Sequence, residues 1–198
     1  YCISNIYKVG GKERVLTNKV NWLAEHGHTV GIVTTDQNGE PPYFSLHPKV
    51  RIFDLEINYD KDKPSSFIFK LHRFLEYRTN HYKRLKSVVN EFKPEIIVSL
   101  LGREFAILPA FKDRVKLVAE CHFCHFYYST YSRGGFLGFI DKISFKSMKR
   151  RLSQFDAFVV LTDEDKIDWN LENIHVIPNA RTFNSIEKSD VSSRRVIT

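Results

Sequence analysis

The sequence alternates short apolar runs of strand character with longer segments of helical periodicity. Strands alternating with helices form a parallel sheet covered by helices on both faces, so the predicted fold class is α/β with a mostly parallel sheet. The expected strands span residues 1–4, 28–35, 50–55, 95–100, 115–120, 157–161 and 174–177. The expected helices span residues 12–26, 67–92, 104–111 and 134–152, and a further short helix is capped by Thr162.

Two adjacent glycines, Gly10 and Gly11, occupy the turn between the first strand and the first helix. Glycines let backbone N–H groups approach a ligand closely, and the start of a helix carries a partial positive charge. This turn is therefore a candidate binding site for a phosphate or diphosphate. In the usual winding, the turn faces Leu101, Gly102 and Arg103 across the crevice beyond the central strands. The Gly-x-Gly-x-x-Gly and Gly-x-x-x-x-Gly-Lys-Ser/Thr patterns are absent.

The bulk composition favours a single domain with an acidic partner. The chain has 198 residues and a formal net charge of +7, which suits a nucleic acid, an anionic membrane or a phosphorylated ligand. Three cysteines give no disulfide framework and favour a reducing compartment. We find no signal peptide and no apolar run near the ~20 residues that a membrane span needs. These features predict a cytoplasmic protein.

Four motifs follow one another along these elements: Gly-Gly-x-Glu-Arg-Val at 10–15, Glu-Cys-His at 120–122, Val-Val-Leu-Thr at 159–162 and Val-Ile-Pro-Asn at 176–179. Their combination resembles the N-terminal half of bacterial family 4 glycosyltransferases, which have the GT-B fold. The resemblance implies a Rossmann-like, acceptor-side domain over residues 1–179. Residues 180–198 would then be a linker and the start of a C-terminal donor domain.

The resemblance also implies a function for the full-length protein. It would be a retaining glycosyltransferase of hexosyltransferase type that moves a sugar from a UDP- or GDP-sugar to a glycan or lipid-linked acceptor. The setting would be bacterial surface polysaccharide synthesis, with no cofactor and no metal. The chain alone would be inactive, because most donor contacts belong to the second domain.

Individual site roles combine this resemblance, which applies to His122, with the local chemistry of the other residues. His122 is the candidate catalytic residue, which would orient a hydroxyl or contact the transferring sugar rather than act as a nucleophile. Gly10 and Gly11 would contact the donor phosphates, and Lys12, Gly102 and Arg103 would bind the acceptor. An aromatic loop at 127–131 could also line the acceptor site.

Several alternatives stay open at this stage. The cluster at 121–125 contains Cys and His at spacings that could suit zinc, although no second cluster accompanies it. The basic amphipathic segments at 70–86 and 140–151 suit either a solvated face or peripheral contact with the anionic inner face of a membrane. A non-catalytic basic α/β module for an anionic partner, or an inverting GT-B enzyme, could share this fold. No nucleic-acid-binding motif is present.

Overall fold

The computed structural model describes residues 1–59, 67–123 and 135–180, and these form one seven-stranded sheet in which every neighbouring pair is parallel. The strand order is β3-β2-β1-β4-β5-β6-β7. The strands are β1 (Cys2–Ile3), β2 (Gly31–Thr34), β3 (Arg51–Asp54), β4 (Ile96–Ser99), β5 (Lys116–Glu120), β6 (Ala157–Val160) and β7 (Ile174–Val176). The helices are α1 (Gly11–Glu25), α2 (Phe67–Phe92), α4 (Gly135–Leu152) and α5 (Asp163–Trp169), with 3₁₀ turns η1 (Arg103–Ala106) and η2 (Leu108–Phe111). The α/β class and the parallel sheet are confirmed.

β1 lies at the centre of the sheet and pairs on both sides. Cys2 is in register with Val33 of β2 and with Ser99 of β4. The chain builds the β2–β3 half first and then crosses to the β4–β7 half, so strand order reverses between β1 and β4. Open parallel sheets bind ligands beyond the carboxyl ends of the strands at this switch point.

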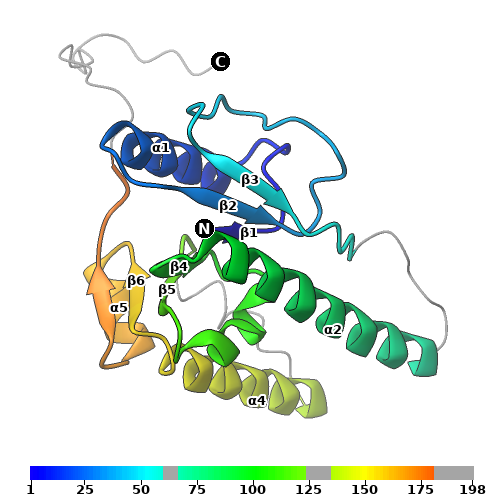
Figure 1. Ribbon diagram of the computed structural model, residues 1–198. Coiled ribbons are helices and arrows are strands. Elements are labelled where there is room, and N and C mark those ends of the chain that lie inside the picture. Colours follow the sequence, from blue (N-terminus) through cyan, green and yellow to red (C-terminus); the bar gives the residue numbers. More distant parts are fainter. Residues whose placement is uncertain (60–66, 124–134, 181–198) are drawn as a thin grey trace, which may run out of the picture.

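Helices cover both faces of the sheet, as predicted. α1 lies on one face, while α2 and α4 lie on the other (Figure 1). A buried cluster that includes Leu16 and Val20 of α1 and Ile32 of β2 fills the first interface. A larger cluster on the opposite face joins the inner sides of α2, α4 and α5 to β4, β5 and β6, and includes Leu85, Leu152, Trp169, Ile97, Leu117 and Phe158.

Local sequence signals explain where α1 ends and where α5 begins. Gly27, with φ of +86°, follows the last turn of α1 and adopts the left-handed conformation that glycine tolerates best. The Thr162 hydroxyl accepts a hydrogen bond from the Asp165 N–H at the start of α5, so the predicted cap is confirmed. The β-branched strands are shorter than predicted, β1 in particular.

The prediction of one helix over residues 104–111 is wrong. The segment instead forms the two 3₁₀ turns η1 and η2, with Ile107 between them. Pro109 has no N–H to donate to a preceding carbonyl, and Ala110 donates to the carbonyl three residues back, at Ile107. The aromatic loop at 127–131 and residues 181–198 of the expected linker and donor-domain start lie outside the described residues.

Trp169 offers a test of the larger core. Its side chain is fully buried, stacked on Phe145 at 5.4 Å and edge-on to Phe158 at 5.2 Å between ring centroids. We expect Trp169→Ala to lower the free energy of unfolding by about 3–5 kcal/mol in urea denaturation. Trp22→Ala is the matched control, because Trp22 is 56% exposed and should change stability by less than about 1 kcal/mol. Equal losses for the two variants would contradict this packing.

Candidate active site

The amino end of α1 lies at the switch point, and the helix itself supplies no acceptor for its first backbone N–H groups. Gly10 is the N-cap residue in an extended conformation, and its carbonyl accepts the first helical hydrogen bond, from the Arg14 N–H at 3.1 Å. The N–H groups of the first turn have no acceptor within the helix. Apart from its chain neighbours and the nearby backbone of α1, a Cβ atom built on Gly11 would meet no described atom within 4 Å. Open space therefore lies beside Gly11, where an anion could approach the helix.

The turn after β4 is organised by a buried carboxylate. Glu104 Oε1 accepts hydrogen bonds from Ser99 Oγ at 2.7 Å and from the Gly102 N–H at 2.9 Å. Leu101 has φ of +57°, a left-handed conformation that is costly for a branched apolar residue. A Cβ atom on Gly102 would lie 2.3 Å from Glu104 Oε2, so a larger residue at this position would displace the carboxylate from its hydrogen bonds.

Glu104 also connects this turn to the amino end of α1. Burial raises the pKa of the Glu104 carboxyl, against the lowering effect of the bonds from Ser99 and Gly102 and of the positive charge on Lys12. β1 and β4 are adjacent parallel strands, so the turn at 10–12 and the turn at 101–104 follow strands whose carboxyl ends lie at the same edge of the sheet. This edge carries Gly10, Gly11, Lys12, Gly102 and Arg103, whose individual roles stay predictions.

Arg103 is placed by an aromatic platform. Its guanidinium carbon lies 4.4 Å from the centroid of the Tyr59 ring, within the range of a cation–π contact. The Tyr59 hydroxyl is 2.8 Å from Nδ1 of His81, which is buried on α2. Burial lowers the pKa of His81 to about 4, so this histidine is neutral at neutral pH. Tyr59 therefore holds Arg103 against the carboxyl edge of the sheet.

His122 lies just beyond β5 in a three-residue polar network. Its Nε2 atom is 3.2 Å from Oε2 of Glu120, and the same oxygen accepts a hydrogen bond from Lys19 Nζ of α1 at 2.7 Å. The side chains of His122 and Glu120 are only 7% and 10% exposed. The network ties the helix that follows the glycine turn to the strand that precedes His122.

The charge on Glu120 fixes the tautomer of a neutral His122. Burial alone would raise the pKa of Glu120, but the hydrogen bonds from His122 and Lys19 outweigh it and lower the pKa below its ordinary value. Glu120 is thus a carboxylate at neutral pH, and a carboxylate can only accept. Nε2 of His122 must donate to it. Nδ1 then carries a lone pair, and it is buried without a hydrogen-bond partner among the described residues.

Sequence reasoning identified His122 and the two facing turns but missed the residues that hold them. Glu104 carried a readable signal, a lone acid among apolar residues just after a buried strand. Lys19 carried none, because its partner Glu120 is distant in the sequence.

The described residues give no positive evidence for a metal site or a membrane-spanning helix. They contain no group of three or more His, Cys, Asp or Glu side chains that could hold a metal ion. Cys121 Sγ is buried and donates to the Phe123 carbonyl oxygen at 3.0 Å. Cys124 and His125, from the suggested zinc cluster, lie outside the described residues.

Among the helices of the described residues, none has the length and apolar character to cross a bilayer.

The raised pKa of Glu104 predicts a pH-dependent stability. Above the ordinary glutamate pKa of 4.5, the folded protein keeps a proton that the unfolded chain has lost. The free energy of unfolding therefore falls as pH rises from 4.5 towards the raised pKa. Glu104→Gln removes this titration and keeps an oxygen that can accept from Ser99 and Gly102. We expect the variant to gain stability relative to the parent as pH rises, measured by urea denaturation across this range.

The control for that experiment is Glu25→Gln, because Glu25 is exposed on α1. Its stability should run parallel to that of the parent at every pH. A Glu104→Gln curve that also ran parallel would show that Glu104 ionises normally in the folded protein.

Comparison with known proteins adds independent findings. Residues 9–181 match the family model of Glycosyltransferase Family 4. The fold is similar to sucrose-phosphate synthase from Thermosynechococcus elongatus, with a TM-score of 0.63 at 14% identity. It is also similar to WaaG, a glycosyltransferase involved in lipopolysaccharide biosynthesis, with a TM-score of 0.55 at 15% identity. Each likeness covers 89% of this chain and 44% of the other.

At these identities the solved structures establish the fold, which is the Rossmann-like fold of GT-B glycosyltransferases. This chain spans less than half the length of either structure. A search of the curated proteins finds no match. The family model, in contrast, matches most of the sequence, including the glycine turn, His122 and the Ile-Pro-Asn motif. The chain therefore belongs to glycosyltransferase family 4.

Proposed function

We propose that the full-length protein is a retaining glycosyltransferase, of hexosyltransferase type, that uses a UDP- or GDP-sugar. This chain forms the acceptor-side domain over residues 1–179, and residues 180–198 lead into a donor domain. The observation that carries the proposal is the link between Lys19 of α1 and Glu120 Oε2, at 2.7 Å, with His122 on the same oxygen. This link connects α1, whose first turn is the proposed anion site, to His122, whose Nδ1 atom has no hydrogen-bond partner among the described residues.

Each part of the site has a separate task in this proposal. The N–H groups at the start of α1 bind the donor diphosphate, which carries the negative charge that grows as the bond to the anomeric carbon breaks. His122 Nδ1 accepts a hydrogen bond from a hydroxyl of the transferring sugar or the acceptor and so orients it. Lys12, Gly102 and Arg103 lie beside the path of the acceptor. No described residue is assigned as a covalent nucleophile, and the proposal includes no metal or cofactor.

The cellular setting belongs to the same proposal. One structural relative is named for lipopolysaccharide biosynthesis, which supports a role in bacterial surface polysaccharide synthesis with a glycan or lipid-linked acceptor. The protein would act in the cytoplasm, with peripheral contact between its basic helices and the anionic inner face of the membrane. This chain alone would transfer no sugar, because most donor contacts belong to the donor domain.

The direct test uses the full-length protein with a panel of UDP- and GDP-sugars. We expect one of them to be consumed, with release of the nucleoside diphosphate, and the glycosidic product to keep the donor's anomeric configuration by NMR. No binding of any nucleotide sugar would refute the proposal, and an inverted product would refute the retaining mechanism.

Gly11→Val tests the phosphate turn. Gly11 is the first residue of α1 and has open space beside it, so valine should fold normally while its methyl groups obstruct the N–H donors. Loss of a hydrogen bond to a charged group costs about 1.5–3 kcal/mol, so donor affinity should fall roughly tenfold or more. Titration with the nucleotide sugar measures the affinity, and circular dichroism checks the fold. Gly11→Ala should give a smaller loss. Unchanged affinity in the valine variant would mean that the loop is only a turn.

His122→Ala tests the catalytic assignment. Removing one positioned hydrogen-bonding group commonly lowers turnover by ~10²-fold or more, and we expect a loss of this size in kcat for the full-length protein. Thermal unfolding should show a folded variant. A variant as active as the parent would contradict the assignment.

Glu120→Gln is the companion variant, since it keeps the imidazole but replaces the anion that selects its tautomer. Gln can accept from Lys19 or donate to His122, so the preference for a proton on Nε2 is lost. We expect an intermediate fall in kcat and a changed pH profile. A merely structural Glu120 would alter stability while leaving the pH profile as it was.

A further inference from the structure

A polar pocket lies at the carboxyl edge of the sheet, next to the switch point. The described residues leave a cavity of about 300 Å³ there, lined from four segments: residues 4, 5, 7 and 8 after β1, residues 36 and 38 after β2, Asn58 after β3 and Arg103 after β4. Gly10, Gly11 and His122 are not part of its lining. The pocket is therefore a separate compartment beside the groups to which we assign donor binding and transfer.

The segments that follow β1 and β2 form one wall of the pocket, and hydrogen bonds join them. The Asp36 N–H donates to the Ser4 carbonyl at 2.9 Å, and the Asp36 carboxylate accepts from the Tyr59 N–H at 2.7 Å. Asn38 Nδ2 donates to the Asp36 carbonyl at 3.0 Å and lies 3.5 Å from the Tyr7 hydroxyl. These bonds fix the shape of the pocket in the absence of any ligand.

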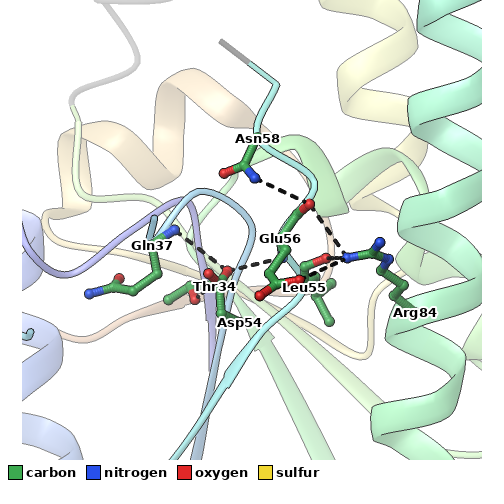
Figure 2. Close-up of polar contacts among 7 residues, drawn as sticks. All are labelled: Thr34, Gln37, Asp54, Leu55, Glu56, Asn58 and Arg84. Carbon is green, nitrogen blue, oxygen red and sulfur yellow. Dashed lines mark hydrogen bonds and ion pairs between the residues drawn. The ribbon is translucent and has the colours of Figure 1, made fainter. Parts of the chain in front are cut away.

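The wall after β3 is fixed from two sides, as Figure 2 shows. Asp54 Oδ1 accepts from Thr34 Oγ1 and from the Glu56 N–H, both at 3.1 Å. Arg84 of α2 donates to the carbonyls of Leu55 and Glu56. This arrangement holds the segment that leads to Asn58.

The orientation of the Asn58 amide follows from these contacts. Its Nδ2 group donates to the Glu56 carbonyl at 3.4 Å (Figure 2). Its Oδ1 atom is buried and has no hydrogen-bond partner among the described residues, and the same holds for Oδ1 of Asn5. Both residues belong to the lining of the pocket. A buried acceptor without a donor is costly, so these two oxygens call for a ligand or solvent that donates.

The chemistry of the lining selects among ligands. A phosphate offers almost only acceptor oxygens at neutral pH, so it would leave both amide oxygens unsatisfied and would face the Asp36 carboxylate. A sugar ring carries hydroxyls that donate to Asn5, Asn58 and Asp36 and accept from Lys8 and Arg103. The volume is at the lower end of the range for small-molecule sites, which suits one ring rather than an oligosaccharide.

We propose that this pocket binds a single hydroxyl-rich sugar ring, the terminal residue of a glycan acceptor, rather than the phosphate of a lipid carrier. The inference rests on the proposed function, because the site is an acceptor site only if the protein transfers sugar. It adds the substrate class, and it adds Asn5 and Asn58 as specificity-determining residues that touch the acceptor.

The test measures binding of a panel of methyl hexopyranosides to the full-length protein by calorimetry and saturation-transfer NMR, without nucleotide sugar. Asn58→Gly removes the amide and preserves the backbone, since Asn58 has φ of +54°. We combine it with Asn5→Ala. Asn170→Gly is the matched control, because Asn170 has φ of +45° at the end of α5 and does not line the pocket.

We expect one or more glycosides to bind, with affinity about tenfold or more weaker in the double variant and unchanged in the control. Nucleotide-sugar affinity should stay the same in all three proteins. The inference is overturned if no glycoside binds, if the double variant binds as the parent does, or if inorganic phosphate displaces the glycoside from the pocket.

The same experiment separates this inference from the proposed function. Asn58-dependent glycoside binding by a protein that binds no nucleotide sugar would refute glycosyl transfer and support the sugar site. Normal nucleotide-sugar binding without any glycoside binding would refute the sugar site alone.

Discussion

Parallel pairing of Cys2 with both Val33 and Ser99 joins the two halves of the sheet. β1 consists of two described residues, both almost fully buried, yet it brings the carboxyl ends of β2 and β4 to the same edge. Every candidate site group lies on a segment that leaves this edge: the glycine turn after β1, the Leu101–Arg103 turn after β4 and His122 after β5. The functional geometry therefore depends on strand order rather than on any single loop.

Two buried glutamates at this edge have pKa values shifted in opposite directions because their partners differ. Glu104 receives neutral donors from Ser99 and Gly102, and burial raises its pKa. Glu120 is bonded by Lys19 and His122, and its pKa falls. Glu104 therefore serves to hold a strained turn, whereas ionised Glu120 selects the tautomer of His122. Lys19 and His122 bond directly to Glu120, whereas Lys12 acts on Glu104 only through space, so one glutamate organises a turn and the other acts on a candidate catalytic group.

Local pattern was enough to predict the elements that apolar periodicity defines. The helix over 67–92 has the predicted bounds, and the strand positions follow the β-branched runs. The 3₁₀ turns over 103–111 were mispredicted because Pro109 and the packing of Phe105 and Phe111 against the core outweigh helical periodicity there. Two parts of the candidate site were predictable from the sequence: the glycine turn at Gly10 and Gly11, and His122 at the end of a strand. Lys19 was not, because an ion pair with a partner 101 residues away leaves no local pattern.

One loop after β1 connects the polar pocket to the first turn of α1. Residues 4, 5, 7 and 8 line the polar pocket, and α1 begins at Gly11, so a single short loop after β1 separates the proposed acceptor ring from the proposed diphosphate. The loop is fixed at the pocket side, where the Ile6 N–H donates to Gln37 Oε1 at 3.0 Å and the Ile6 carbonyl accepts from the Tyr43 N–H at 2.8 Å. It is fixed at the other side by the first turn of α1. Because both ends are held, the loop fixes the spacing between the polar pocket and the first turn of α1, and a fixed spacing of this kind is one condition under which proximity lowers a barrier.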